Sequence, residues 1–152
     1  MSARRLTITV SETLHVRRPP EAVFDFTQDY ATRSDWDPVI REARVLRDEP
    51  RTVRVSVNGV GSYSIVYAMF RRPERTSASF EEVRSWWLRG GGGSWQYVPR
   101  DGGTDWTQTN TLELRHPRLL RPLAPLVRRQ LRDGMRAGMA RAKAILEARA
   151  TG

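Results

Sequence analysis

Two side-chain amides stand on a largely apolar face near the end of the strand-rich part of the chain. In a strand over residues 104–115, Gln108 and Asn110 point to the same side. That side also carries Trp106, Leu112 and Leu114. A buried amide without a hydrogen-bond partner costs about 1 to 3 kcal/mol. Its partner could be a carbonyl or hydroxyl of a bound ligand, or instead a water molecule or a backbone group.

Aromatic side chains with polar tips form a second candidate group. They are mainly apolar, but a hydroxyl or indole N–H gives each one directional contact, which suits an apolar pocket for a small molecule. The alternative is that they fill the core themselves. The residues of this kind in the strand region are Tyr63, Tyr67, Trp86, Trp95, Tyr97 and Trp106.

Charged residues offer a few weaker candidates. Asp35 or Asp37 could act as a general acid or base if burial raised its pKa, but helix capping and turn formation beside Pro38 is the favoured interpretation. Strand alternation groups Glu82 and Arg84 with the apolar residues around them, so they either pair with each other or lie on the other face.

Several chemistries find no support in the sequence. The chain has no cysteine, which excludes disulfides and thiolate catalysis. His15 and His116 are far apart and lack companion ligands or a triad pattern, so we predict no metal site. Gly90–Gly93 is not followed by the Lys-Ser/Thr of a phosphate loop. We expect no cofactor.

A long terminal helix is the main element that must position these residues. Apolar residues recur at three- and four-residue steps after Pro117, and Met135 and Met139 lie in that series. Prolines 122 and 125 interrupt its beginning, so the unbroken helix is predicted over about 126–148. Gly134 and Gly138 either let the sheet or a ligand come close or lie on a tolerant exposed face.

Short strands separated by turns precede that helix. Residues 6–16 alternate as a half-buried strand, and Pro20 opens a short helix that is followed by a second short helix or a turn over 30–36. The dipeptide Asn58-Gly59 predicts a tight hairpin, and Gly90–Gly93 predicts a permissive loop. Further strands are predicted at 42–48, 52–58, 62–71, 76–89 (one long strand or a bent pair), 94–98 and 104–115.

This order of elements predicts an α+β helix-grip fold. Sequential strands joined by hairpins form an antiparallel sheet, here of seven strands with two short helices and one long C-terminal helix. A strongly curved sheet and a straight helix cannot touch along their whole length. The space between them must hold large side chains, water or a ligand.

Four segments together resemble the START-like superfamily, also called SRPBCC, which includes polyketide cyclase/dehydrase-like and lipid-transfer proteins. They are VRRPPEAVFDFTQDY, SDWDPVI, SWQYVPRDGGTDWTQTNTLEL and the apolar terminal helix. The resemblance covers essentially the whole chain and implies a single domain over residues 1–152, with an elongated, largely apolar cavity between sheet and helix. It also implies that the segment around Trp36 helps to close one end of that cavity.

Charge is concentrated in the terminal helix. The chain has a formal net charge of +9, and residues 115–150 hold nine arginines and Lys143 against Asp133 and Glu147. A solvated polar face is the favoured interpretation, while contact with nucleic acid or an anionic membrane is the alternative. We expect a cytoplasmic protein, because no apolar run has the length of a signal peptide or membrane span. We expect it to be a monomer or homodimer.

We therefore expect the protein to bind a small hydrophobic ligand: a lipid, isoprenoid or polyketide-like molecule. The alternative is a polyketide aromatase/cyclase-like enzyme in which Tyr63, Tyr67, Gln108 and Asn110 orient carbonyls and Asp35 or Tyr67 transfers a proton. Whether the protein is an enzyme stays open. The predicted ligand-binding residues are Trp36, Tyr63, Tyr67, Trp86, Trp95, Trp106, Gln108, Asn110, Met135 and Met139.

Overall fold

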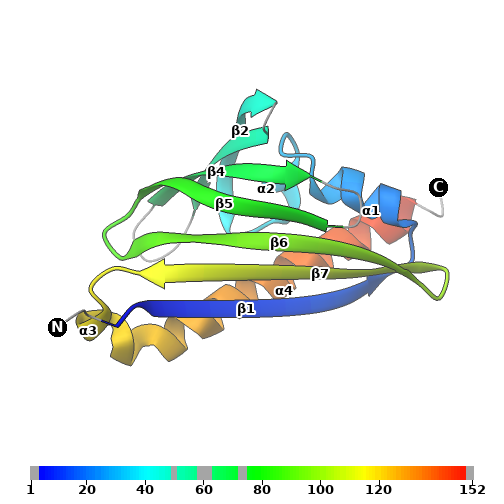
Figure 1. Ribbon diagram of the computed structural model, residues 1–152. Helices are drawn as coiled ribbons and strands as arrows, with labels where there is room; N and C mark the ends of the chain where they lie inside the picture. Colours follow the sequence, from blue (N-terminus) through cyan, green and yellow to red (C-terminus); the bar gives the residue numbers. More distant parts are fainter. Residues whose placement is uncertain (1–3, 49–50, 58–62, 72–74, 150–152) are drawn as a thin grey trace.

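A computed structural model describes residues 4–48, 51–57, 63–71 and 75–149 of the chain (Figure 1). The elements are β1 (Leu6–Val16), α1 (Pro20–Thr27), α2 (Arg33–Trp36), β2 (Ile40–Asp48), β3 (Arg51–Val57), β4 (Tyr63–Arg71), β5 (Arg75–Arg84), β6 (Leu88–Arg100), β7 (Gly103–Leu114), α3 (Pro117–Leu120), η1 (Arg121–Leu123) and α4 (Ala124–Arg149). The predicted hairpin at Asn58-Gly59 lies outside the described residues.

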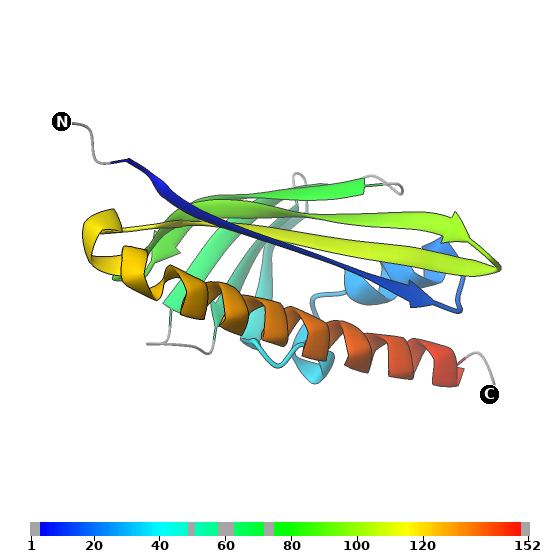
Figure 2. The ribbon, with the colours of Figure 1, turned by 90° about the horizontal axis from the view of Figure 1, so that it is seen from below.

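The strands form one antiparallel sheet in the order β1-β7-β6-β5-β4-β3-β2. Neighbours in the chain are neighbours in the sheet, except that β1 joins β7. Figure 2 shows α4 running along one side of the sheet, with α1 on that same side. The helix-grip architecture and the seven-stranded curved sheet are therefore confirmed.

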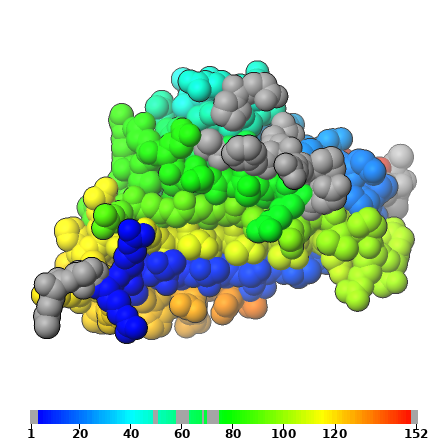
Figure 3. Space-filling model, viewed as in Figure 1, coloured from blue at the N-terminus to red at the C-terminus, as the bar shows by residue number. Residues whose placement is uncertain are grey.

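The two faces of the sheet differ in polarity as the alternation predicted. On the outer face, seen in Figure 3, three hydroxyl pairs link β1 to β7: Thr9 to Thr111 at 3.1 Å, Ser11 to Thr109 at 2.9 Å and Thr13 to Thr107 at 2.8 Å. The inner face carries the buried core residues Ile8, Val10, Trp106, Leu112 and Leu114. Cross-strand pairing of this kind fixes the register that turns Gln108 inward.

The four glycines at 90–93 lie inside strand β6, so the predicted loop there is wrong. Gly91 and Gly92 are needed because neighbouring backbone comes too close for a Cβ, whereas Gly90 has open space around it. A Cβ on Gly91 would collide with the carbonyl oxygen of Thr111, and Gly91 has a φ of 152° that side chains rarely adopt. Glycine in a strand often marks such a close approach or a bend.

A bulge in β5 changes which residues face inward. Tyr67 pairs with Phe80 but Val66 pairs with Glu82, which leaves Glu81 as an extra residue. Phe80 and Val83 then pack on the core, whereas Glu82 and Arg84 point outward and pair with each other at 2.8 Å. Simple alternation had grouped Glu82 and Arg84 with Phe80, and the bulge is the reason that this grouping is wrong.

Helix α4 packs closely against the segment that connects α2 to β2. A Cβ on Gly134 would lie 2.6 Å from Cγ2 of Val39, and one on Gly138 would lie 3.4 Å from Cδ of Pro38. The glycines thus let another part of the chain approach the helix. The sequence predicted an approach by the sheet or a ligand, and this connection approaches instead.

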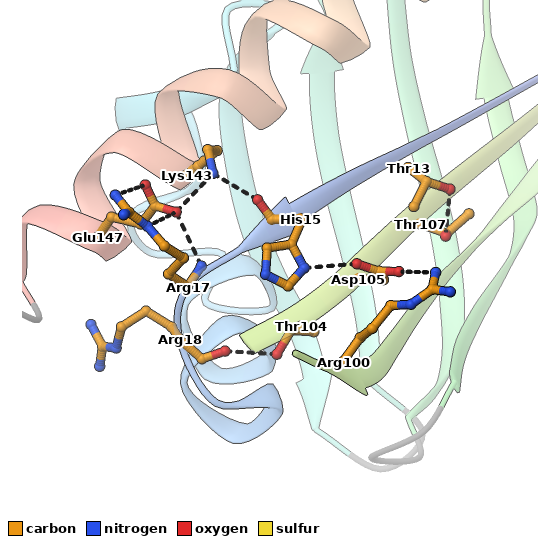
Figure 4. Close-up of polar contacts among 10 residues, drawn as sticks. All are labelled: Thr13, His15, Arg17, Arg18, Arg100, Thr104, Asp105, Thr107, Lys143 and Glu147. Atoms are coloured by element: carbon orange, nitrogen blue, oxygen red, sulfur yellow. Dashed lines mark hydrogen bonds and ion pairs between the residues drawn. The ribbon is translucent and has the colours of Figure 1, made fainter. Parts of the chain in front are cut away.

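Polar contacts join the end of β1 to the last turns of α4 (Figure 4). The Lys143 ammonium donates to the backbone oxygen of His15 and to Oε1 of Glu147, both at 2.7 Å. The Arg17 backbone N–H donates to the same Glu147 oxygen at 3.0 Å. Farther along the helix, Arg132 and Arg136 each form an ion pair of 3.1 Å with Glu12. These contacts hold α4 against the edge strand.

We expect Glu147→Gln to destabilise the fold at neutral pH by about 1 kcal/mol, since charge-assisted bonds near the surface are partly screened. The Lys143 and Arg17 hydrogen bonds lower the pKa of Glu147 from 4.5 to about 2. Because that pKa is lowered by folding, the contribution is complete above the unfolded-state pKa and is lost as the pH falls toward 2. Urea titrations at several pH values test this, with the exposed Glu81→Gln as control. A loss of unfolding free energy in Glu147→Gln that stays the same at every pH would contradict this expectation.

Candidate functional site

A cavity of about 120 Å³ lies between the inner face of the sheet and α4. The middle strands form one wall with Val55, Val57, Ile65 and Phe80, and Leu131 and Met135 of α4 form the opposite wall. Its lining is mainly apolar because alternate strand residues and one helix face meet there.

Seven of the ten predicted ligand-binding residues line this cavity. They come from α2, β4, β6, β7 and α4, elements that are far apart in sequence. They are Trp36, Tyr63, Tyr67, Trp95, Gln108, Asn110 and Met135.

The other three predicted residues lie elsewhere. Trp106 and Met139 are fully buried in the core, where the Trp106 ring packs edge-on against Trp36 with centroids 6.0 Å apart. Trp86 is 56% exposed because β5 ends at Arg84 and Ser85 starts a turn, in which its Oγ accepts hydrogen bonds from the Trp87 and Leu88 N–H groups. We had expected Trp86 on the inner face, and this turn moves it to the surface.

Trp86 instead lines a second cavity of about 250 Å³ near the beginning of α4. Trp87 shares this wall, and its ring packs against Tyr63 with centroids 5.1 Å apart. Sequence reasoning missed Trp87, although its position beside Trp86 was a signal. The two cavities share four lining residues, Val39, Tyr63, Leu112 and Leu131. The two cavities are therefore adjacent, with these four residues between them.

A buried ion pair lies in the wall of the first cavity. Nε of Arg33 lies 3.1 Å from Oδ2 of Asp37, and the two side chains are 3% and 11% exposed. The Arg33 guanidinium also donates to the backbone oxygen of Thr27 at 3.1 Å and lies 4.5 Å from the ring centroid of Trp36. Sequence reasoning missed Arg33, although the i, i+4 spacing to Asp37 was a signal.

The charge state of Arg33 follows from its neighbours. Burial is the largest single effect and lowers the pKa of Arg33, but the charge and hydrogen bond of Asp37 together with Tyr30 and Tyr67 outweigh it, so the net pKa is raised. The guanidinium is therefore a permanent cation among aromatic rings, balanced by one carboxylate.

The tyrosines that line the cavity keep their protons at neutral pH and can donate hydrogen bonds. Burial raises the pKa of Tyr63 to about 12. Burial also raises the pKa of Tyr67 well above 10, and the neighbouring Tyr30 adds to the rise while Arg33 opposes it. Both phenols therefore stay protonated, which suits hydrogen bonding to a ligand oxygen and excludes a role as general base.

Two indole N–H groups in the cavity wall are buried without a hydrogen-bond acceptor among the described residues. They belong to Trp36 and Trp95, which are 1% and 4% exposed. Buried donors of this kind usually find a partner. The indole N–H of Trp87, which lines the second cavity, is unpaired in the same way, so residues with an unpaired indole donor line both cavities.

The two aspartates beside Trp36 have different positions. Asp37 is the ion-pair partner of Arg33, and its Oδ1 accepts the Val39 backbone N–H at 3.1 Å. This is the turn-forming role that the sequence analysis favoured for an aspartate beside Pro38. Asp35 is exposed and lines neither cavity, so its proposed part in proton transfer finds no support in its position.

Two kinds of feature are absent from the described part of the chain. Within residues 4–48, 51–57, 63–71 and 75–149, no cluster of three or more His, Cys, Asp or Glu side chains could hold a metal ion. None of the helices in these ranges combines the length and apolarity needed to cross a bilayer.

Comparisons with known proteins agree with this architecture. A family model described as polyketide cyclase/dehydrase and lipid transport matches residues 7–147. The comparison with curated proteins gives no match.

Solved structures show the same fold at low sequence identity. The protein TTHA0849 from Thermus thermophilus is 18% identical, with a TM-score of 0.82, over 93% of this chain and 98% of that one. The Zhui aromatase/cyclase from Streptomyces sp. R1128 is 16% identical, with a TM-score of 0.81, over 95% and 96%. A START superfamily protein from Mycobacterium smegmatis is 18% identical, with a TM-score of 0.71, over 93% and 95%.

Proposed function

Because the chain belongs to the polyketide cyclase/dehydrase and lipid transport family, we propose that it binds a small hydrophobic ligand between the sheet and α4. The observation that carries the proposal is the pair of adjoining cavities, about 120 and 250 Å³ in volume. Sites for small organic ligands have volumes of roughly 300–1,000 Å³ and are mostly apolar with a few placed polar groups. Each cavity alone is smaller than that range, so the proposal is that one ligand extends through both.

The arrangement of polar groups favours one orientation of the ligand. The first cavity is lined by the charged or amide side chains of Arg33, Asp37, Gln108 and Asn110, whereas the second is lined mainly by leucines and tryptophans, with Gln130. A ligand with a carbonyl or carboxyl oxygen at one end and a hydrocarbon body would satisfy both parts. An isoprenoid, a fatty acyl chain and a polyketide all have this character.

Titration with the dye N-phenyl-1-naphthylamine tests the proposal, because its fluorescence rises in an apolar site. We expect saturable binding of one dye molecule per chain, and competition by long-chain fatty acids. Fluorescence that rises without saturation, or that fatty acids do not reduce, would mean that the cavities do not act as a ligand site.

A second candidate function is the cyclisation of a poly-ketone, as in an aromatase/cyclase. The observation that favours it is the convergence of Tyr67 from β4 with Gln108 and Asn110 from β7 on one cavity. These groups could hold two carbonyls in a reactive arrangement, and orientation alone can supply much of a rate. The similarity to the Zhui aromatase/cyclase is consistent with this function.

Incubation with a poly-β-ketone thioester tests the enzymatic function by mass spectrometry and ultraviolet absorption of the product. If the protein is a cyclase, we expect Tyr67→Phe and Gln108→Leu each to slow aromatic product formation by about 100-fold, as the loss of one oriented donor does. The matched control is Thr109→Val, on the outer face of β7. Failure of the wild type to form the product, or equal rates in all variants, would leave simple ligand binding.

A further inference from the structure

Exposed apolar side chains gather around the opening of the second cavity. Seven large hydrophobic residues are exposed in the described part of the chain, and four belong to this region. We call these four the rim patch: Trp86 at 56%, Leu119 at 68%, Leu123 at 48% and Leu126 at 53% exposed. Three of them line the cavity, and Leu119 precedes Leu120, which also lines it. Clustered exposed apolar residues mark contact surfaces.

The rim patch occupies one end of the molecule. Figure 2 shows α3, η1 and the first turns of α4 at the end opposite the C-terminus, and Figure 1 shows the β5–β6 connection at that same end. Leucines from 119–126 and Trp86 are therefore contributed by separate segments that meet at the mouth of the cavity.

Positive charge lies on the helical side of the rim patch. Residues 114–132 contain no acidic residue and six arginines, at positions 115, 118, 121, 128, 129 and 132. Arg118 and Arg121 are exposed, and neither forms an ion pair with any described residue. By contrast, Arg129 and Arg132 are paired with Asp133 and Glu12. The charge on α3 and η1 is therefore available to an external anion.

We propose that the rim patch docks the protein on an anionic lipid bilayer, with the mouth of the second cavity against the membrane. Leucine and tryptophan side chains insert at the acyl boundary, and tryptophan favours that depth. Each arginine near an anionic surface adds about 1 kcal/mol of attraction. A nucleic acid would use the arginines but would leave three exposed leucines in water, so it explains only half of the patch.

Docking in this orientation would let an apolar ligand pass between bilayer and cavity without crossing water. This consequence rests on the proposed ligand binding, whereas the docking itself does not. An experiment can therefore contradict the proposed ligand binding without contradicting the proposed docking, and the reverse. Dye binding in solution tests the cavity, and vesicle binding of the same purified protein tests the rim patch.

Co-sedimentation with vesicles is the test. We expect the wild type to bind phosphatidylcholine vesicles that contain about 30% phosphatidylglycerol, and to bind pure phosphatidylcholine much less. Raising the salt concentration from about 50 to about 500 mM should weaken the binding, because it screens surface charge.

Variants separate the two contributions. We expect Leu119→Ser to weaken vesicle binding about fivefold, since an inserted apolar group is lost. The double change Arg118→Gln with Arg121→Gln should weaken it by about tenfold or more. None of these three residues lines the first or the second cavity, so dye binding should be unchanged. Matched controls are Val98→Ser, 53% exposed near the opposite end of the molecule, and Arg141→Gln on the exposed side of α4.

Three results would overturn the proposal. The first is no binding of the wild type to the anionic vesicles. The second is an equal loss in the control variants, which would mean that the contact is not at the rim patch. The third is binding to a DNA duplex, at the same salt concentration, that depends on the two arginines and is stronger than vesicle binding. That result would assign the surface to nucleic acid.

Discussion

Replacing Arg33 with alanine should lower the free energy of unfolding by about 3 to 5 kcal/mol, the range found when one partner of a buried ion pair is removed. The change leaves the Asp37 carboxylate in a site where it is 11% exposed and keeps the Val39 N–H as a donor. It also removes the bond to the Thr27 carbonyl and the stacking on Trp36. Urea unfolding followed by circular dichroism measures the loss.

An exposed pair of the same chemistry provides the matched control. Arg84 and Glu82 lie 2.8 Å apart, but their side chains are 76% and 46% exposed. Arg84→Ala should therefore cost less than about 1 kcal/mol. Arg33→Met combined with Asp37→Asn should recover part of the loss, because it removes both charges and keeps an acceptor for Val39. Equal losses in the Arg33 and Arg84 variants would show that burial of the pair does not stabilise the fold.

The general architecture was predictable from the sequence because its signals are periodic. Alternation in residues 6–16 and 104–115 and the three- and four-residue steps of the last helix determine which faces are apolar. Those faces correctly placed Tyr67, Gln108 and Met135 on a common interior.

Features that break a period were not predictable. The extra residue Glu81 shifts the face of every later residue in β5, and nothing in the local sequence marks it. The glycines at 90–93 are typical of a loop, but here Gly91 permits a close approach to Thr111 in a neighbouring strand. Arg33 belongs in the core only because Asp37 and three aromatic rings surround it after folding. Such positions are determined by tertiary contacts.

Filling the first cavity should abolish ligand binding while the fold remains. Ala78 lines this cavity from the inner face of β5. A void of about 150 Å³ accommodates a benzene molecule, so the ring of Ala78→Phe would occupy most of a cavity of about 120 Å³. We expect the affinity for N-phenyl-1-naphthylamine to fall by about 100-fold, because the first cavity and its donors are no longer accessible.

The neighbouring residue supplies the control for this variant. Ser79 is exposed on the outer face of the same strand, so Ser79→Phe adds the same ring without touching the cavity. It should retain the affinity of the wild type. The unfolding transition of Ala78→Phe should remain cooperative, since an unoccupied space receives the ring. If both variants bound the dye equally, the binding site would lie outside the first cavity.

A crystal structure of the protein with a bound fatty acid measures the location of the ligand most directly. We predict electron density for the chain in the second cavity, between Trp87 and Leu123, and for the carboxyl group near Trp95, Gln108 and Arg33. Density on the outer surface alone, or side chains that close the space between the sheet and α4, would contradict the proposed function.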